Sequence, residues 1–361
     1  MPTQFDHLVA FMSDQAIDAV SVLFDQRFHI NRVTLVGLAR HMQNAESVGW
    51  VIKRRLGVNP KFVTLPSPHL PEQFCTAVED LLRRSEGHLA VNLNTEDAVC
   101  ACLALQVAAR VNTPVFAVET QYDRLVWLSA AERPLAPLEI EDKMHCLDLF
   151  EMQDFEYIGS ASVRDYANKL ACAQRLLKIA IQDESSLLRI LPKTGLTPRI
   201  SSDSSNVVML LKDSSLIRPS ATGRLQFVSQ EAIAFVRGGW LEMVVFDAIT
   251  MLAKRAGIVD SHRGLSLRNK SGLVYEFDIV FMLQNALHII ECKSGDSRGN
   301  KFLTHFEGIT RAHGLRARKM LVSVDRLSDT LVAAADGLDI ACIHGHQLSE
   351  LSARLSKWMR G

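Results

Sequence analysis

The sequence has no excess of charge of either sign, because its 361 residues include 40 Lys and Arg and 40 Asp and Glu. A protein that coats nucleic acid through its overall charge carries a large basic excess, so this class is excluded. Zero net charge is still compatible with a local basic patch. A hydrophobic share of 48% and a charged share of 22% are typical of a globular protein and exclude a disordered or fibrous chain.

The seven cysteines lack the spacing of a disulfide framework or a zinc site, since only Cys100 and Cys102 lie close together. Buried thiols of a cytoplasmic protein are the simpler interpretation. No apolar run reaches the ~18 residues of a membrane span, and the first residues do not resemble a secretion signal. We therefore expect a cytoplasmic protein without a membrane partner, built from two or three domains.

Residues 1–150 alternate between short apolar segments and amphipathic segments. The expected strands are 7–12, 32–38, 61–65, 88–93 and 114–119, and the expected helices are 16–23, 42–56, 71–84 and 96–110. Apolar strands separated by helices form a parallel sheet that is covered on both faces. This part of the chain is therefore predicted to be a Rossmann-like domain.

Residues 151–236 have a different order of elements. Helices are expected at 163–182, 187–191 and 206–213, followed by a two-stranded ribbon that turns near 220–223. Helices followed by a ribbon indicate a winged-helix-like connector. The segment 206–213 is mostly apolar and carries one Lys, so a spacer or a dimer element is as consistent with it as DNA readout.

Residues 237–361 form a third unit with mixed elements. Helices are expected at 240–256, 302–313, 328–335 and 348–359, and strands at 265–268, 274–281, 287–292, 319–324 and 339–343. Two of these strands flank Gln284-Asn285, which predicts a β-hairpin that turns at these two residues.

This hairpin would place chemically active residues together. With a turn at residues 284–285, Asp278 lies opposite Glu291, and alternation places Glu291 and Lys293 on one face. Two facing carboxylates repel each other and need a counter-charge, which a bound divalent cation would supply. Lys293 would then orient or deprotonate a water molecule, or neutralise phosphate charge.

A third carboxylate, Glu242, is expected on the apolar stripe of the helix 240–256, because apolar residues follow it at spacings of three and seven. The same cation is a candidate partner for it. Two structural alternatives remain. The positive end of the helix dipole favours a Glu in the first turn, and an ion pair between Glu276 and Lys293 would explain the acid-x-lysine pattern without a metal.

Glu242 in GGWLE, Asp278, and Glu291-Cys292-Lys293 in HIIECKSG resemble the motif of the PD-(D/E)xK nuclease superfamily. More narrowly, the chain resembles the CRISPR-associated nucleases in which an N-terminal CARF domain, of Rossmann-like topology, is fused to that nuclease domain. The resemblance implies that Asp278, Glu291 and the backbone carbonyl of Cys292 bind Mg²⁺ or Mn²⁺, with Glu242 as an auxiliary ligand. It also implies that Lys293 positions the attacking water for phosphodiester cleavage.

Basic residues are concentrated after this motif. Residues 237–361 contain 17 Lys and Arg against 13 Asp and Glu, and seven of the basic residues lie between positions 293 and 319. A phosphate backbone of single-stranded DNA or RNA, or of a nicked duplex, would bind at such a stretch. A solvated helix face is the alternative. The predicted substrate-binding residues are Arg298, Lys301, Arg316 and Arg318.

The resemblance further implies a homodimer in which the N-terminal domain binds a cyclic oligoadenylate and regulates the nuclease. The family has a Thr-Gly-Gly-Thr-Lys turn after the fourth strand, whereas this chain has Asn94-Thr95-Glu96-Asp97-Ala98. The glycines and the lysine are absent, and the two acidic residues would repel phosphate while favouring the helix N-terminus. The domain could instead bind another ligand or serve only in dimerisation. The predicted ligand-binding residues are Ser13, Asp14, Asn94 and Thr95.

The sequence thus predicts an α/β protein of three parts. Residues 1–150 would form a Rossmann-like, CARF-type sensor domain, residues 151–236 a winged-helix-like connector, and residues 237–361 a restriction-endonuclease-like PD-(D/E)xK domain. Two alternatives stay open for the function. One is a non-catalytic nucleic-acid-binding regulator with a relic nuclease fold, and the other is a nuclease that no cyclic oligoadenylate controls.

Overall fold

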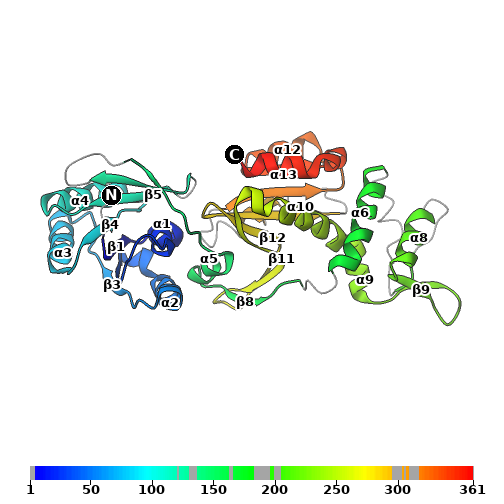
Figure 1. Ribbon diagram of the computed structural model, residues 1–361, viewed down its shortest axis with the longest axis horizontal. Coiled ribbons are helices and arrows are strands. Elements are labelled where there is room, and N and C mark those ends of the chain that lie inside the picture. Colours follow the sequence, from blue (N-terminus) through cyan, green and yellow to red (C-terminus); the bar gives the residue numbers. More distant parts are fainter. Residues whose placement is uncertain are drawn as a thin grey trace.

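Two large β-sheets lie side by side along the long axis of the molecule, and a smaller helical part lies at one end (Figure 1). The computed structural model describes residues 5–119, 122–129, 136–161, 166–182, 196–198, 205–294, 303–304, 306–308 and 317–360. Within these residues, no helix is both long enough and apolar enough to span a bilayer.

The N-terminal sheet has the strand order β3-β2-β1-β4-β5-β6-β7. Its strands are β1 (His7–Phe11), β2 (Arg32–Gly37), β3 (Lys61–Thr64), β4 (Leu89–Asn92), β5 (Val115–Glu119), β6 (Arg124–Ser129) and β7 (Leu138–Glu139). The first five are parallel and agree with the expected strands, whereas the antiparallel β6 and β7 were not foreseen. The Rossmann-like fold is confirmed.

Helices cover both faces of this sheet, which explains why its central strands β1, β2 and β4 are mostly apolar and buried. The helices are α1 (Ala16–Val20), α2 (Ala45–Leu56), α3 (Pro71–Arg84) and α4 (Ala98–Arg110). The core on one face includes α1 and α2, and the core on the other face includes α3 and α4. Local sequence sets the helix ends, since Pro71 opens α3 and Gly57, with φ of 72°, closes α2.

The C-terminal sheet has the strand order β15-β14-β13-β12-β11-β8. Its strands are β8 (Glu156–Gly159), β11 (Ile258–Arg268), β12 (Val274–Leu283), β13 (Ala286–Lys293), β14 (Ala317–Ser323) and β15 (Ile340–His344). In the predicted hairpin β12–β13, Ile279 pairs with Ile290 and the turn residues Gln284 and Asn285 both have φ of 53°. Positive φ at both positions is the geometry of a two-residue type I′ turn, so the predicted turn and register are confirmed.

Two hydrophobic cores lie against this sheet. One includes α10 (Trp240–Ala256) and α13 (Leu351–Met359), and the other includes α5 (Cys146–Met152) and α12 (Asp329–Asp336). The second core continues into the N-terminal sheet. In Figure 1, α5 accordingly lies between the two sheets.

The connector consists of α6 (Tyr166–Gln182), α8 (Ser205–Asp213), the ribbon β9–β10 (Ile217–Pro219 and Leu225–Phe227) and α9 (Gln230–Ala234). A π-helical turn, Phe235–Gly239, joins α9 to α10. The helices and ribbon occur in the expected winged-helix-like order, and α6 packs on α10. The expected helix 187–191 lies outside the described residues, as does most of 302–313. The domain limits stay predictions, although β8 extends the C-terminal sheet from a segment assigned to the connector.

Candidate active site

The hairpin β12–β13 brings Asp278 and Glu291 together. Backbone pairing between the two strands ends at Ile279 and Ile290, so these carboxylates occupy the next position along the ladder. There the Cys292 N–H donates to Asp278 Oδ2 at 2.7 Å. The Asp278 carboxylate thus accepts a hydrogen bond that a backbone carbonyl of β12 would accept in a regular ladder. The hydrogen bond fixes the orientation of the Asp278 carboxylate at the open end of the hairpin.

The carboxylates interact unfavourably with one another. Burial raises the pKa of Asp278 to about 8, with further contributions from the negative charges of Glu291 and Glu242. Burial also raises the pKa of Glu242, while the nearby Arg263 acts in the opposite direction. Three acidic groups are therefore gathered in a poorly solvated place, where a further positive charge would stabilise them.

Lys293 supplies one positive charge at this place. Its ammonium group forms a hydrogen-bonded ion pair with Glu291. Burial lowers the pKa of Lys293, but the charge and hydrogen bond of Glu291 outweigh that effect and the pKa is raised. Lys293 is therefore a cation at neutral pH. Glu276, its alternative partner, lies opposite Ser266 of β11.

Glu242 reaches the site from the first turn of α10. Its Oε2 lies 3.8 Å from the Arg263 guanidinium, whose side chain is only 13% exposed. Arg263 was not singled out from the sequence. Its position in β11 could have indicated it, because this strand pairs with the one that carries Asp278.

The π-helical turn before α10 packs against the end of β13. The Ser294 hydroxyl donates to the Arg237 carbonyl. A Cβ added to Gly238 would lie 3.8 Å from Ser294 Oγ and 3.9 Å from Glu242 Oε1. Single π-helical turns are often found at functional sites. This one fixes where α10 begins and therefore where Glu242, in its first turn, is placed.

The donor atoms fit a hard divalent cation, because Asp278, Glu291, Glu242 and the Cys292 carbonyl all offer oxygen. No three His, Cys, Asp or Glu side chains among the described residues form a ready-made metal cluster. Each carboxylate is instead held by a protein cation or N–H group, as described above. The thiol of Cys292 is an unsuitable ligand, since burial raises its pKa well above the usual value.

The predicted substrate-binding residues are mostly outside the described part of the chain. This applies to Arg298, Lys301 and Arg316, and their role stays a prediction. Arg318 of β14 pairs with His288 of β13, which lies three residues before Glu291. The Arg318 guanidinium donates to the Trp358 carbonyl at 3.3 Å.

Lys319, counted in the basic stretch, is not available to a phosphate in this structure. It is 8% exposed, forms an ion pair with Glu307 and donates to the Leu338 carbonyl at 2.9 Å.

The predicted ligand-binding residues of the N-terminal domain lie at one edge of its sheet, because β1 and β4 are parallel neighbours. Three of these side chains, those of Asn94, Ser13 and Thr95, bind local backbone. Asn94 donates to and accepts from Val118 at 2.8 and 2.7 Å, and the Ser13 hydroxyl bonds within its own turn to Gln15. Asp14 is exposed, and Thr95 is half-buried and accepts from the Asp97 N–H at 3.3 Å.

The acidic turn at this edge stabilises the following helix. Asp97 accepts from the Cys100 N–H at 2.9 Å and so caps α4, as expected for an acid at this position. Arg40, which follows β2 and was not singled out from the sequence, lies 3.5 Å from Asp97 and is mostly exposed. This guanidinium is a cation at the predicted ligand edge.

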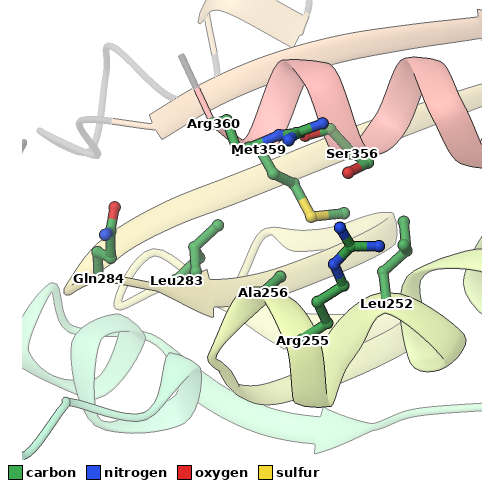
Figure 2. A pocket seen from close by; sticks show the side chains of 8 residues that line it. All are labelled: Leu252, Arg255, Ala256, Leu283, Gln284, Ser356, Met359 and Arg360. Carbon is green, nitrogen blue, oxygen red and sulfur yellow. The ribbon is translucent and has the colours of Figure 1, made fainter.

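A hollow of about 220 Å³ lies at the other end of the hairpin (Figure 2). It is lined by Leu252, Arg255, Ala256, Leu283, Gln284, Ser356, Met359 and Arg360. Gln284 is six residues from Asp278, or about 20 Å along a strand. The hollow is therefore separate from the carboxylates and contains no acidic residue.

Comparisons with known proteins identify a domain family and related folds. Residues 229–361 match the family model of the Card1-like endonuclease domain. No curated protein sequence matches the chain. The crystal structure of protein VC1899 from Vibrio cholerae is similar over 98% of both chains, with 22% sequence identity and a TM-score of 0.86.

Two further solved structures are similar. Can2 from Sulfobacillus thermosulfidooxidans, in complex with cyclic tetra-adenylate, has 20% identity and a TM-score of 0.75 over 99% of this chain and 100% of that chain. A type III CRISPR defence DNA nuclease activated by cyclic oligoadenylate has 20% identity and a TM-score of 0.56 over 90% of this chain and 46% of that chain. The resemblance drawn from the motif and the predicted fold class are confirmed, and the C-terminal third is an endonuclease domain of the Card1-like type.

Proposed function

We propose that this chain is a metal-dependent nuclease, which hydrolyses phosphodiester bonds of DNA or RNA and is regulated by a cyclic oligoadenylate bound to the N-terminal domain of a homodimer. The observation that carries the proposal is the cluster of Asp278, Glu291 and Glu242 beside the charged Lys293. The match to an endonuclease family over the residues that contain this cluster supports it. The likeness to Can2 with cyclic tetra-adenylate supports the ligand.

Mg²⁺ or Mn²⁺, held by the three carboxylates and the Cys292 carbonyl, would polarise the scissile phosphate and activate water. The protein's own groups have defined parts. The Cys292 N–H holds the Asp278 carboxylate in place. Lys293 is protonated, so it serves as a cation that orients water and stabilises charge on the phosphate rather than as a general base.

At the sensor edge, the exposed groups decide what binds. The side chains of Asn94, Ser13 and Thr95 hold local backbone. Arg40 and Asp14 are exposed and are the side chains left for a ligand. Arg40 is the phosphate-binding candidate, because a guanidinium binds phosphate oxygens in a bidentate way.

The nuclease proposal is tested by cleavage of single-stranded DNA, single-stranded RNA and nicked plasmid with Mn²⁺. We expect Glu291→Gln and Lys293→Ala each to lower the rate by at least about 100-fold. The first would weaken the proposed metal site, and the second would remove a cation that stabilises charge on the phosphate. Glu156→Gln is the matched control, because this acid lies on the same sheet and pairs with Arg268 at 3.0 Å. Equal rates in all variants would refute the assignment.

The regulatory ligand is tested separately by calorimetric titration with cyclic tetra-adenylate and cyclic hexa-adenylate. Binding of either one, together with faster cleavage, is the expected result. A nuclease that binds neither would be regulated differently, and a protein that binds nucleic acid without cutting it would be the non-catalytic regulator.

A further inference from the structure

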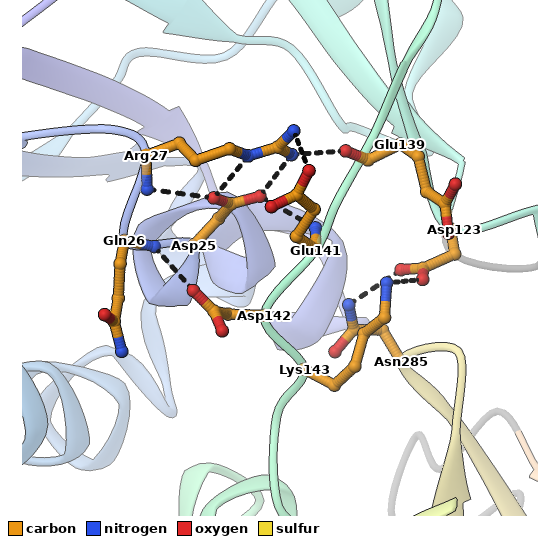
Figure 3. A network of polar contacts seen from close by, with 9 residues as sticks. All are labelled: Asp25, Gln26, Arg27, Asp123, Glu139, Glu141, Asp142, Lys143 and Asn285. Carbon is orange, nitrogen blue, oxygen red and sulfur yellow. Dashed lines mark hydrogen bonds and ion pairs between the residues drawn. The ribbon is translucent and has the colours of Figure 1, made fainter. Parts of the chain in front are cut away.

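A short segment, residues 139–146, connects the two sheets and is bonded to both. We call it the strap. On the sensor side, the fully buried Asp25 accepts from the Glu141 N–H at 2.8 Å and from the Arg27 guanidinium at 2.7 Å (Figure 3). Arg27 also reaches the Glu141 carboxylate at 2.8 Å, and the Gln26 N–H donates to Asp142 at 2.9 Å. The strap is therefore fixed to the loop between α1 and β2.

On the nuclease side, the strap meets the turn of the hairpin β12–β13. Asn285 is 1% exposed, and its Oδ1 accepts from the Met144 N–H at 2.7 Å. Its Nδ2 donates at 2.8 Å to Asp123, which precedes β6 of the sensor sheet and forms an ion pair with Lys143 of the strap. One amide thus joins the strap, the sensor sheet and the hairpin (Figure 3).

These contacts need an asparagine, whereas the turn alone does not. The Met144 N–H needs an acceptor and the Asp123 carboxylate needs a donor, and among side chains of this length only an amide supplies both. The left-handed backbone of a type I′ turn is also adopted by glycine. The neighbouring Gln284 has the same φ of 53° but an exposed side chain.

We propose that Asn285 is a positioning residue, which ties the hairpin that carries Asp278 and Glu291 to the sensor domain through the strap. Its consequence for cleavage rests on the proposed function. A shift of the sensor strands would move the turn, and a two-stranded hairpin would transmit that shift to Glu291 and Asp278, six and seven residues from Asn285. Because Asn285 is buried at the turn, at the opposite end of the hairpin from the carboxylates, it acts through the hairpin and not in the chemistry.

The proposal is tested in the full chain by amide hydrogen exchange of Asn285→Gly, with Gln284→Gly as the matched control at the same turn. We expect the Met144 and Glu141 amides to exchange about tenfold faster in Asn285→Gly than in the control, because one net hydrogen bond is worth about this factor. The Glu141 amide decides the matter, since it donates to Asp25 at the far end of the strap. Equal Glu141 exchange in both variants would overturn the coupling.

A rescue experiment separates coupling from turn propensity. Asn285→Asp keeps the acceptor for Met144 but places two carboxylates face to face, and adding Asp123→Asn exchanges donor and acceptor. We expect the ratio of ligand-stimulated to basal cleavage to fall in Asn285→Asp and to recover in the double variant. An unchanged ratio in the single variant would refute the positioning role. If the wild type never cuts, the proposed function fails, and the exchange comparison still decides the coupling.

Discussion

The buried carboxylate of Asp278 destabilises the folded protein when it is charged and without a cation. Its pKa is raised to about 8, whereas an unfolded chain has the ordinary value of 3.8. Because the pKa is higher in the folded protein, the destabilisation is absent below pH 3.8. It grows as the pH rises above 3.8 and is complete once the pH has passed about 8. Neutral and mildly alkaline conditions are thus the ones in which a divalent cation would stabilise the site.

We therefore expect Asp278→Asn to raise the melting temperature of the protein in EDTA at pH 8 by a few degrees. We also expect Mn²⁺ to raise the melting temperature of the wild type but not that of Asp278→Asn. Thermal melts with EDTA and with Mn²⁺ check both expectations, with Glu156→Gln as the control. An equal effect of Mn²⁺ on wild type and Asp278→Asn would speak against this aspartate as a ligand.

His288 is predicted to make stability depend on pH in the acidic range. It stacks on Phe281 with centroids 4.7 Å apart, and burial lowers its pKa to about 4. Its Nε2 has no hydrogen-bond partner among the residues that the structure describes. With a folded pKa below the unfolded 6.5, the unfolded chain binds the proton first. Stability from the neutral ring is therefore complete above pH 6.5 and is lost as the pH falls toward 4.

We expect His288→Phe to remove about 2 kcal/mol of the loss in unfolding free energy between pH 7.5 and pH 5. At pH 7.5 the variant should be at least as stable as the wild type, because an aromatic ring keeps the packing. Urea unfolding at the two pH values measures both quantities. His29→Gln, at an exposed position, is the control and should leave the pH dependence unchanged. If His288→Phe lost as much unfolding free energy between pH 7.5 and pH 5 as the wild type does, the assignment to His288 would be wrong.

At the scale of elements, strands and helices whose apolar residues recur with a clear period could be predicted from the sequence. The hairpin β12–β13 was placed in register because its turn and the two-residue period of a strand fix which side chains face each other. The strand β8 could not be found, since its four residues pair with β11 about a hundred positions later. Nothing local distinguishes such an edge strand from a loop.

The site residues, too, could be predicted only where the signal lies in the local sequence. Asp278, Glu291 and Lys293 came from local pattern, whereas Arg40 and Arg263 meet their acidic partners only through the tertiary fold. Lys319 shows the opposite error, because a basic stretch in the sequence does not reveal that one of its members is buried against Glu307.

The N-terminus of α4 offers a prediction about the ligand. Asp97 caps this helix and also lies 3.5 Å from Arg40. Asp97→Asn keeps an oxygen acceptor for the cap but removes a negative charge, so cyclic tetra-adenylate should bind about 3- to 10-fold more tightly. Arg40→Ala should weaken binding by a similar factor.

Calorimetric titration of the Asp97 and Arg40 variants measures these changes. Asp80→Asn is the control, because this acid pairs with Arg84 within α3 at 3.2 Å. Weaker binding in Asp97→Asn, or unchanged binding in Arg40→Ala, would place the ligand elsewhere.

At the scale of the whole molecule, one hydrophobic core joins the two sheets. It contains residues of β1 and α2 as well as residues of β11, β12 and α12, and α5 lies between them. Phe150 of α5 is 1% exposed and its ring lies 5.4 Å from that of Phe277 in β12. On its other side α5 is bonded to α2, where Arg54 meets Asp148 at 2.8 Å.

A shared core makes the two sheets unfold together, so the wild type should show a single calorimetric transition. Phe150→Ala should lower the unfolding free energy by about 3–5 kcal/mol and split this transition in two, because it removes the packing that couples the sheets. Phe74→Ala is the control of equal size, since Phe74 is fully buried in the core between the N-terminal sheet and α3 and α4. It should lower the transition temperature without splitting the transition. If the calorimetric transition split in Phe74→Ala and not in Phe150→Ala, the sheets would be coupled by something other than α5.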